Sequence, residues 1–339
     1  SSVHCRTGVV MSAYLKAPLL EGVVQIGVQP RRYLSEAHYR EELLKFRKYD
    51  PEDWKGTLKV HATGFMIKPW VGLVLFTLLL TKATKDYFPD LIGLVSLNPS
   101  VHAVLGSALS FIMVFRTNTA YSRWWEARLL WGQVANNVRS VATRARPMMK
   151  SEADFEALLA QMIAFAVLLK NHLRGEPTRA DELGELLPAE TLSRFSTFAN
   201  PPLAAIAACS ATVRNGIKTE GPDACMANAT FATLTTALDN MAQAVGGMER
   251  VKNTPTPFGY VAALRTFVLL WLSTMPFTLI GPFGWLACIA IGMLSFLFLN
   301  LEQMAMEIEQ PFGDDADDLP LEDYCLGIER VCLDAIKRL

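Results

Sequence analysis

The stretch that decides the fold is residues 98–133, NPSVHAVLGSALSFIMVFRTNTAYSRWWEARLLWGQ. Its first half is as apolar as a lipid-facing helix. Its second half is polar, basic and aromatic, and neither glycine nor proline occurs from Ser107 to Trp131. Asn98 can accept hydrogen bonds from the free amide groups of a first helical turn, and Pro99 suits the first helical position. We therefore predict one helix that leaves a membrane and continues into an aqueous region.

The composition is typical of a membrane domain with a polar attachment. Of the 339 residues, 51% are hydrophobic and only 19% are charged, and the mean hydropathy is +0.23. A net charge of −1 gives no reason to expect a nucleic-acid partner. The six cysteines show no CxxC spacing, so we expect neither a zinc site nor a disulfide framework.

Apolar blocks predict four membrane crossings, at residues 63–81, 91–115, 258–280 and 283–301. Asn98-Pro99 breaks the second crossing, Pro276 is expected to kink the third, and Gly281-Pro282 is expected to form the tight turn before the fourth. Four crossings place both termini on one side of the membrane. The basic run that follows the second crossing lies on that same side, in agreement with the positive-inside rule.

The remaining segments predict an all-α protein with a large helical region outside the membrane. We divide the chain into a transit-derived or disordered tail (1–32), an amphipathic helical segment (33–62), the first two crossings (63–115), a helical region on the side of the termini (116–256), the last two crossings (257–301), and an acidic loop with a C-terminal helix (302–339).

The chain contains no motif of a known catalytic chemistry. GxGxxG, GxxxxGK[ST], HExxH and GxSxG are all missing from the sequence, and the five histidines are scattered, so we predict that the protein is not an enzyme. Arg265 lies inside the third crossing. It either marks an ion path or pairs with an acid or a carbonyl group near the interface.

Ser107, Phe111 and Phe115 are spaced by four residues, so they share one face of the predicted helix. Asn118, Thr119 and Ser122 approximately continue this face. If several copies of the helix surround an axis, this stripe forms a narrow apolar neck that opens into a polar vestibule. Such a neck can gate ion flow by dewetting. The alternative is that aromatic residues at helical spacing pack into an ordinary core.

The segment FRTNTAYSRWWEARLLWG, residues 115–132, resembles the bestrophin family of anion channels in its bacterial and plant branch. Three further segments resemble shared segments of that family in the right order: Trp54-Lys55-Gly56, PTPFGYVAALRTF at residues 255–267 and IEQPFGDDADDLPLEDYC at residues 308–325. The resemblance covers residue 50 to the C-terminus. It implies a homopentamer around a central pore that passively conducts chloride, with bicarbonate as a second candidate ion.

Carried onto this sequence, the family's neck positions fall on Phe115, Phe111 and Ser107. Ser107 departs from the family pattern, where a larger aliphatic residue is usual, and this implies a wider or wetter end of the neck. Arg116 and Arg123 near the pore mouth, with Asn118 in the vestibule, are expected to raise the local anion concentration.

Animal relatives bind calcium with a loop similar to the acidic run after Gly313, and the two carboxylate ligands would fall on Asp315 and Asp318. Ala316 interrupts this run, and calcium regulation is not the rule in the plant and bacterial branch. Calcium binding, a solvated acidic loop and salt bridges to the basic segment after Phe115 are therefore three alternatives, and no other cofactor is expected.

Within the family, the chain looks most like the voltage-dependent thylakoid members of plants and algae. This implies a thylakoid membrane location with both termini in the stroma, and a bacterial inner membrane is the alternative. The implied partners are other copies of the chain, the lipid bilayer and the permeating anions. A secondary transporter and a non-conducting scaffold are the alternative functions, although a transporter would be expected to show internal repeats.

Overall fold

The computed structural model describes residues 64–88, 90, 97–177, 180–183, 186–187, 189–217, 224–315 and 317–337. The predicted tail, the amphipathic segment at 33–62 and Trp54-Lys55-Gly56 lie outside these residues. The regular elements in the described part of the chain are all helices, and its β pairing is limited to one isolated bridge between Met149 and Ile217. The predicted all-α fold class is confirmed. The described residues within 48–125 and 254–311 form one compact unit, and the other described residues form a second.

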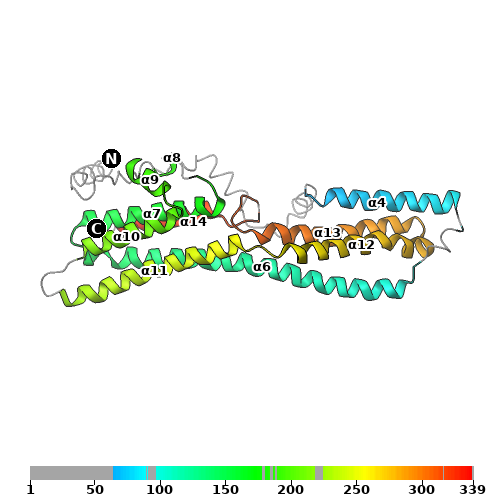
Figure 1. Ribbon diagram of the computed structural model, residues 1–339, viewed down its shortest axis with the longest axis horizontal. Helices are drawn as coiled ribbons and strands as arrows, with labels where there is room; N and C mark the ends of the chain where they lie inside the picture. The colour runs from blue at the N-terminus through cyan, green and yellow to red at the C-terminus, as the bar shows by residue number, and fades with distance from the viewer. Residues whose placement is uncertain are drawn as a thin grey trace. The chain divides into compact units, whose positions relative to one another are not determined.

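The first unit, called the spanning unit here, is built from four helices that are long and apolar enough to cross a membrane. They are α4 (Ile67–Lys82), the first part of α6 (Pro99–Arg144), α12 (Phe258–Phe283) and α13 (Leu286–Glu309). The π-helical turn η1 (Ala83–Tyr87) extends the first span to 21 residues. Within this unit, α4, α12 and α13 run alongside one another (Figure 1). The predicted four spans are confirmed.

The core of the spanning unit is centred on Trp271 of α12. Its indole N–H donates to the backbone carbonyl of His102 at 3.2 Å, and its ring meets Phe298 of α13 edge-on at 5.2 Å. Gly106 of α6 lies directly against the indole, since a Cβ atom at this position would be 2.7 Å from the ring. Leu109, one turn further along α6, is fully buried in the same core. One face of α6 is therefore fixed against α12.

One predicted boundary differs from the structure. The turn between the last two spans does not fall on Gly281-Pro282, because α12 continues to Phe283 and the chain reverses at Gly284, whose φ of +55° favours glycine. The central helix runs past Gly132 and continues to Arg144. A single helical glycine costs only about 1 kcal/mol relative to alanine, and burial of flanking residues such as Trp131 offsets that cost.

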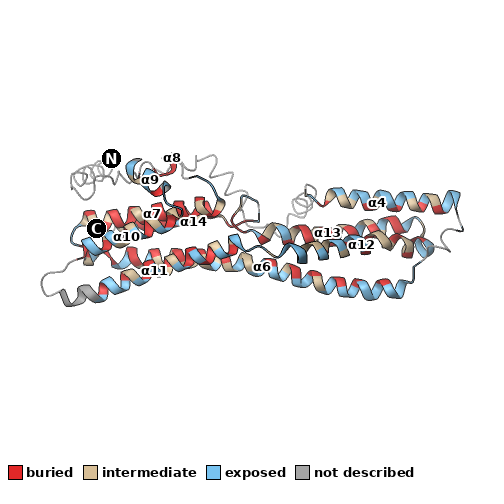
Figure 2. Cartoon of the chain, in the orientation of Figure 1, coloured by how far each residue is buried: buried red, intermediate tan, exposed pale blue. Residues whose placement is uncertain are grey.

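The second unit is a helical bundle centred on α7. Its main helices are the remainder of α6, α7 (Glu152–Arg174), α10 (Pro201–Gly216), α11 (Ala224–Asn253) and α14 (Leu321–Lys337), accompanied by η2 (Arg146–Met148), α8 (Ala180–Leu183) and α9 (Ala189–Ser196). Helix α7 packs against α10, α14 and α11 and is buried along most of its length (Figure 2). The Ser151 hydroxyl caps its first turn, and Gly175 ends it with a φ of +77°. Such burial explains why α7 is apolar without being one of the four spans.

The close contact at Gly106 leads to a stability prediction. Gly106→Ala should lower the melting temperature of the detergent-solubilised protein, because the new methyl group would overlap the rigid indole of Trp271. Gly72→Ala in α4 is the matched control, since a Cβ atom there meets no neighbour within 4 Å. The control should match or exceed the wild-type melting temperature, as alanine favours a helix by about 1 kcal/mol over glycine. Equal melting temperatures for the two variants would contradict this packing.

Candidate functional site

Helix α6 has two opposite stripes in its apolar half. The buried stripe recurs every three or four residues and consists of His102, Gly106, Leu109, Met113, Arg116 and Ala120. The rest of the helix surface is largely exposed, and Ser107, Phe111, Phe115, Asn118 and Ser122 lie along its middle, opposite the buried stripe; these five residues are called the exposed stripe. Phe111 is 65% exposed and Phe115 is 51% exposed. Large aromatic side chains left uncovered in this way mark a surface that is completed by something outside the single chain.

The geometry of the exposed stripe fits a narrow apolar passage. The rings of Phe111 and Phe115 stand perpendicular to each other, with their centroids 4.7 Å apart. The Ser107 hydroxyl donates to the carbonyl of Val104 at 2.8 Å, and the Thr119 hydroxyl donates to that of Phe115 at the same distance. The hydroxyl groups beside the rings are therefore bonded to the helix backbone, which leaves the surface around the two phenylalanines mainly apolar.

Arg116 lies on the buried stripe and not on the exposed one. Its side chain is 1% exposed, and its guanidinium contacts Glu309 at 2.6 Å and Glu302 at 3.6 Å. A guanidinium that is buried and paired with carboxylates contributes little to the field in an aqueous vestibule. In the structure of the single chain, Arg116 therefore does not take the solvent-facing position expected of an anion-attracting group.

The other two predicted vestibule residues lie elsewhere on α6. Asn118 is exposed on the same stripe as the two phenylalanines. Arg123 is half-buried and donates to two backbone carbonyl groups, that of Glu309 at 3.2 Å and that of Thr254 at 2.6 Å. The carbonyl of Glu309 ends α13, so Arg123 also compensates the negative end of that helix dipole.

The acidic loop is held by ion pairs of the second unit. Arg174 of α7 pairs with Glu322 and, at 3.2 Å, with Asp314. Asp318 is buried, and its carboxylate accepts the backbone N–H of Asp315 at 2.8 Å. Among the described residues, no group of three or more His, Cys, Asp or Glu side chains is placed to hold a metal ion. Of the three alternatives for this loop, the geometry favours salt bridges over a calcium site.

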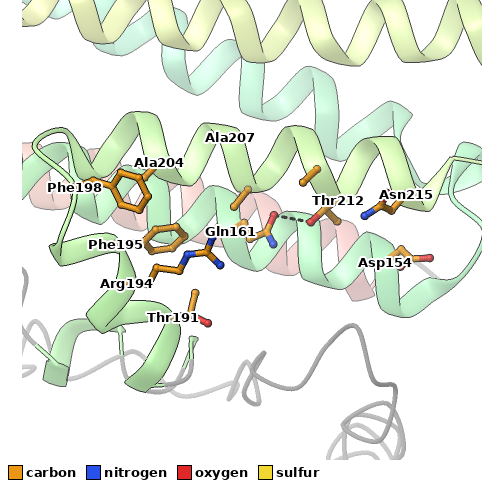
Figure 3. A pocket seen from close by; sticks show the side chains of 12 residues that line it. Asp154, Gln161, Thr191, Arg194, Phe195, Phe198, Ala204, Ala207, Thr212 and Asn215 are labelled. Atoms are coloured by element: carbon orange, nitrogen blue, oxygen red, sulfur yellow. Dashed lines mark hydrogen bonds between the residues drawn. The ribbon is translucent and has the colours of Figure 1, made fainter.

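A groove of about 450 Å³ lies on the second unit between α7, α9 and α10 (Figure 3). Its wall on α10 consists of alanines, Phe195 and Phe198 come from the chain around α9, and Thr212 donates to Gln161 at 3.0 Å across its floor. None of its lining residues belongs to either stripe of α6. The groove is thus a surface feature separate from the aromatic stripe.

A four-span helical bundle whose longest helix leaves an aromatic stripe uncovered has the architecture of a membrane channel subunit. The chain belongs to the bestrophin family: the model of the bacterial and fungal bestrophin proteins matches residues 57–334.

Relatives and solved structures agree with this assignment. A voltage-dependent anion channel-forming protein of Nostoc is 33% identical over 279 residues, which cover 80% of this chain and 87% of the relative. A Synechocystis protein of the same description is 31% identical over 234 residues, which cover 68% of this chain and 75% of the relative. The crystal structure of a bacterial bestrophin homologue from Klebsiella pneumoniae is similar with a TM-score of 0.72 at 27% identity, and the match covers 81% of this chain and 99% of that one.

Sequence reasoning missed the acids that surround Arg116. Glu302 and Glu309 are both buried on α13, with relative exposures of 4% and 7%. Their spacing of seven residues places them on one face of that helix, two turns apart. Arg116 likewise continues the spacing of the buried stripe. The sequence did contain a signal for this buried cluster: an arginine at a core position of one span, and two acids on one face of another.

The environment of Asp318 leads to a pH prediction. Burial, reinforced by the nearby carboxylates of Asp315 and Asp314, raises the pKa of Asp318 from its ordinary 3.8 to about 7, against opposing contributions from the Asp315 N–H and Arg174. The folded protein thus holds this proton more tightly than the unfolded chain. This group then favours the folded state increasingly as the pH falls through 7, and that contribution is lost above pH 7.

Asp318→Asn should therefore raise the melting temperature at pH 8 and flatten its dependence on pH between about 4 and 7, the range between the ordinary and the raised pKa of Asp318. The amide oxygen of the substituted side chain can still accept the Asp315 N–H. The exposed Asp317→Asn serves as the control and should keep the wild-type pH profile. Identical profiles for wild type and Asp318→Asn would show that the Asp318 carboxyl does not titrate in this range.

Proposed function

We propose that the chain is the subunit of a homopentameric channel that passively conducts chloride, with bicarbonate as a second permeant ion, down their electrochemical gradients. One observation carries this proposal: Ser107, Phe111 and Phe115 form an uncovered stripe on a membrane-spanning helix whose opposite face is buried in its own chain. Copies arranged around an axis would cover the stripe and turn it into a neck. The anion channels among the relatives support the choice of ion.

In this proposal the neck sets the barrier to conduction. Phe111 and Phe115 narrow it and expel water, so that it can close by dewetting. The positive edges of aromatic rings are attractive to anions, which favours anions over cations at the constriction. Ser107 replaces a bulkier aliphatic side chain and widens one end. Asn118 follows on the polar side, where it would receive the partly dehydrated ion.

We also propose the membrane in which the channel lies. We place the channel in a thylakoid membrane with both termini in the stroma, where chloride flux would reduce the electrical part of the proton-motive force. The resemblance to plant and algal members and the two cyanobacterial relatives support this location. The enterobacterial relatives support the alternative, a bacterial inner membrane. Voltage dependence comes from the descriptions of the relatives and is proposed for this chain by analogy.

Recordings from the purified protein in planar bilayers test the function. The proposal predicts unitary, voltage-sensitive current steps whose reversal potential follows the chloride gradient and not the potassium gradient. Mixed chloride and bicarbonate solutions then give the permeability ratio of the two anions. Slow, saturable flux without unitary steps would indicate a transporter, and silence in a well-incorporated sample would indicate a scaffold. Either result would contradict the proposal.

The same recordings test the neck. Phe111→Ala and Phe115→Ala should increase the unitary conductance or the open probability, because each removes an apolar ring from the constriction. Both rings are exposed in the single chain, so the melting temperature should change much less than the current. Phe283→Ala is the control, since Phe283 is also exposed but ends α12, away from the stripe. Currents of both variants that match wild type would remove these rings from the neck.

A further inference from the structure

A buried charge lies immediately behind the proposed neck. Arg116 follows Phe115 in sequence but belongs to the buried stripe of α6, where Leu109 and Met113 precede it in the apolar core. Burying a charged group is costly unless it is paired and hydrogen-bonded with good geometry. An aliphatic side chain would fill this position without that cost. The presence of an arginine therefore indicates that its charged group has a specific role.

The contacts of Arg116 converge on Glu309, the last residue of α13. Nη2 of Arg116 donates to Oε2 of Glu309 at 2.6 Å, and Oε1 of Glu309 accepts the backbone N–H of Thr256 at 2.7 Å. Both carboxylate oxygens are thus occupied, one by α6 and the other by the segment that leads into α12. Glu302 assists from one side, 3.6 Å from Nε of Arg116, and is itself paired with Arg265 at 2.9 Å.

A second attachment lies two turns further along α6. Arg123 donates to the backbone carbonyls of Glu309 and Thr254, so it holds the same end of α13 and the same segment before α12. Arg116 and Arg123 are seven residues apart and share one face of the helix. The helix is therefore anchored at two successive points that begin directly after Phe115.

These anchors differ in kind from the packing around them. Apolar contacts such as those of Leu109 and Met113 are non-directional and tolerate small rotations of a helix. A short charge-assisted hydrogen bond is directional. The side chains of a helix project at fixed angles around its axis, about 100° apart from one residue to the next. Any rotation of the helix that takes Arg116 away from Glu309 therefore turns Phe115 and Phe111 by the same angle. The angle at which the rings face the pore depends on this bond.

We infer that Glu309 is a positioning residue of the neck: acting through Arg116, its carboxylate fixes the rotation of α6 so that Phe111 and Phe115 face the pore axis. This inference rests on the proposed function, which supplies the axis. Glu309 itself touches no permeating ion, so its effect is on the orientation of the rings.

Bilayer recordings of Glu309→Gln provide the first test. The unitary conductance or the open probability should change by about tenfold, the size expected for losing one charge-assisted hydrogen bond. Glu307→Gln is the matched control on the same helix, since Glu307 accepts from Gln303 within α13, and it should behave as wild type. Glu309→Asp keeps the charge on a shorter side chain and should give an intermediate current.

Arg116→Lys separates position from charge. Lysine keeps the positive charge but lacks the planar fork of Arg116, whose Nη2 donates to Glu309 and whose Nη1 donates to the Thr256 hydroxyl at 3.5 Å. A positioning role predicts that Arg116→Lys resembles Glu309→Gln. The double variant Arg116→Met with Glu309→Leu replaces the buried pair by apolar side chains, which generally preserves folding. This double variant can be recorded if a single variant does not assemble. Its conductance should differ from that of wild type.

Thiol labelling supplies a readout that needs no current. In a background with Cys5 and Cys225 replaced by serine, a cysteine introduced at Phe115 should react faster with a charged methanethiosulfonate reagent than one at Met113, which is 2% exposed. The four remaining native cysteines are buried. Adding Glu309→Gln should reduce the ratio of the two rates severalfold, because the rotated helix turns position 115 inward.

The results separate the two claims. Silent wild-type protein would contradict the proposed function, and the labelling ratio would still decide the positioning role. An active wild type with unchanged current and labelling in Glu309→Gln would overturn the positioning role alone. It would also be overturned if Arg116→Lys conducted as wild type while Glu309→Gln did not, because charge and not orientation would then explain the effect.

Discussion

The contact between Gly106 of α6 and the indole ring of Trp271 on α12 is the constraint on which the rest of the site depends. It allows two spans to approach closely, and it decides which face of α6 is buried. The opposite face of α6 is then not buried within the chain, and its residues can contact other molecules. The exposed stripe is uncovered because the opposite face of the helix is buried, and the neck proposed for Phe111 and Phe115 depends on this division of one helix into two faces.

At the polar end of the spanning unit, interactions of charged side chains also determine which face of α6 is buried. Two arginines of α6 and two acids of α13 lie on the inner side of the helix, where hydrophobic burial alone would leave its rotation loosely defined. The arginines therefore do not have the role expected of basic residues near a pore mouth, which is to attract anions. Arg116 is neutralised within the chain, and Arg123 is bound to the ends of backbone segments. Their common effect is to hold the helix against its neighbours.

Much of this was predictable because local rules and tertiary packing agree. The four apolar blocks, the Asn98-Pro99 start of α6 and the periodic stripe through Phe115 all follow from composition and helical spacing, and the structure confirms the spans and the start of the helix. The turn at Gly284 could not be predicted, because Gly281-Pro282 carries an equally strong turn signal and only the backbone shows which glycine has the positive φ. The burial of Arg116 was missed for a related reason. An arginine after an apolar run resembles the end of a span until its partners, Glu302 and Glu309, are brought to it by the fold.

The central claim is that copies of this chain surround an axis with the exposed stripe of α6 facing it. Electron cryo-microscopy of the full chain in lipid nanodiscs tests this claim most directly. We expect a pentamer in which Ser107, Phe111 and Phe115 line the narrowest part of a central pore, with Arg116 behind them in contact with Glu309. A particle without a central pore, or one in which these rings face lipid, would contradict it.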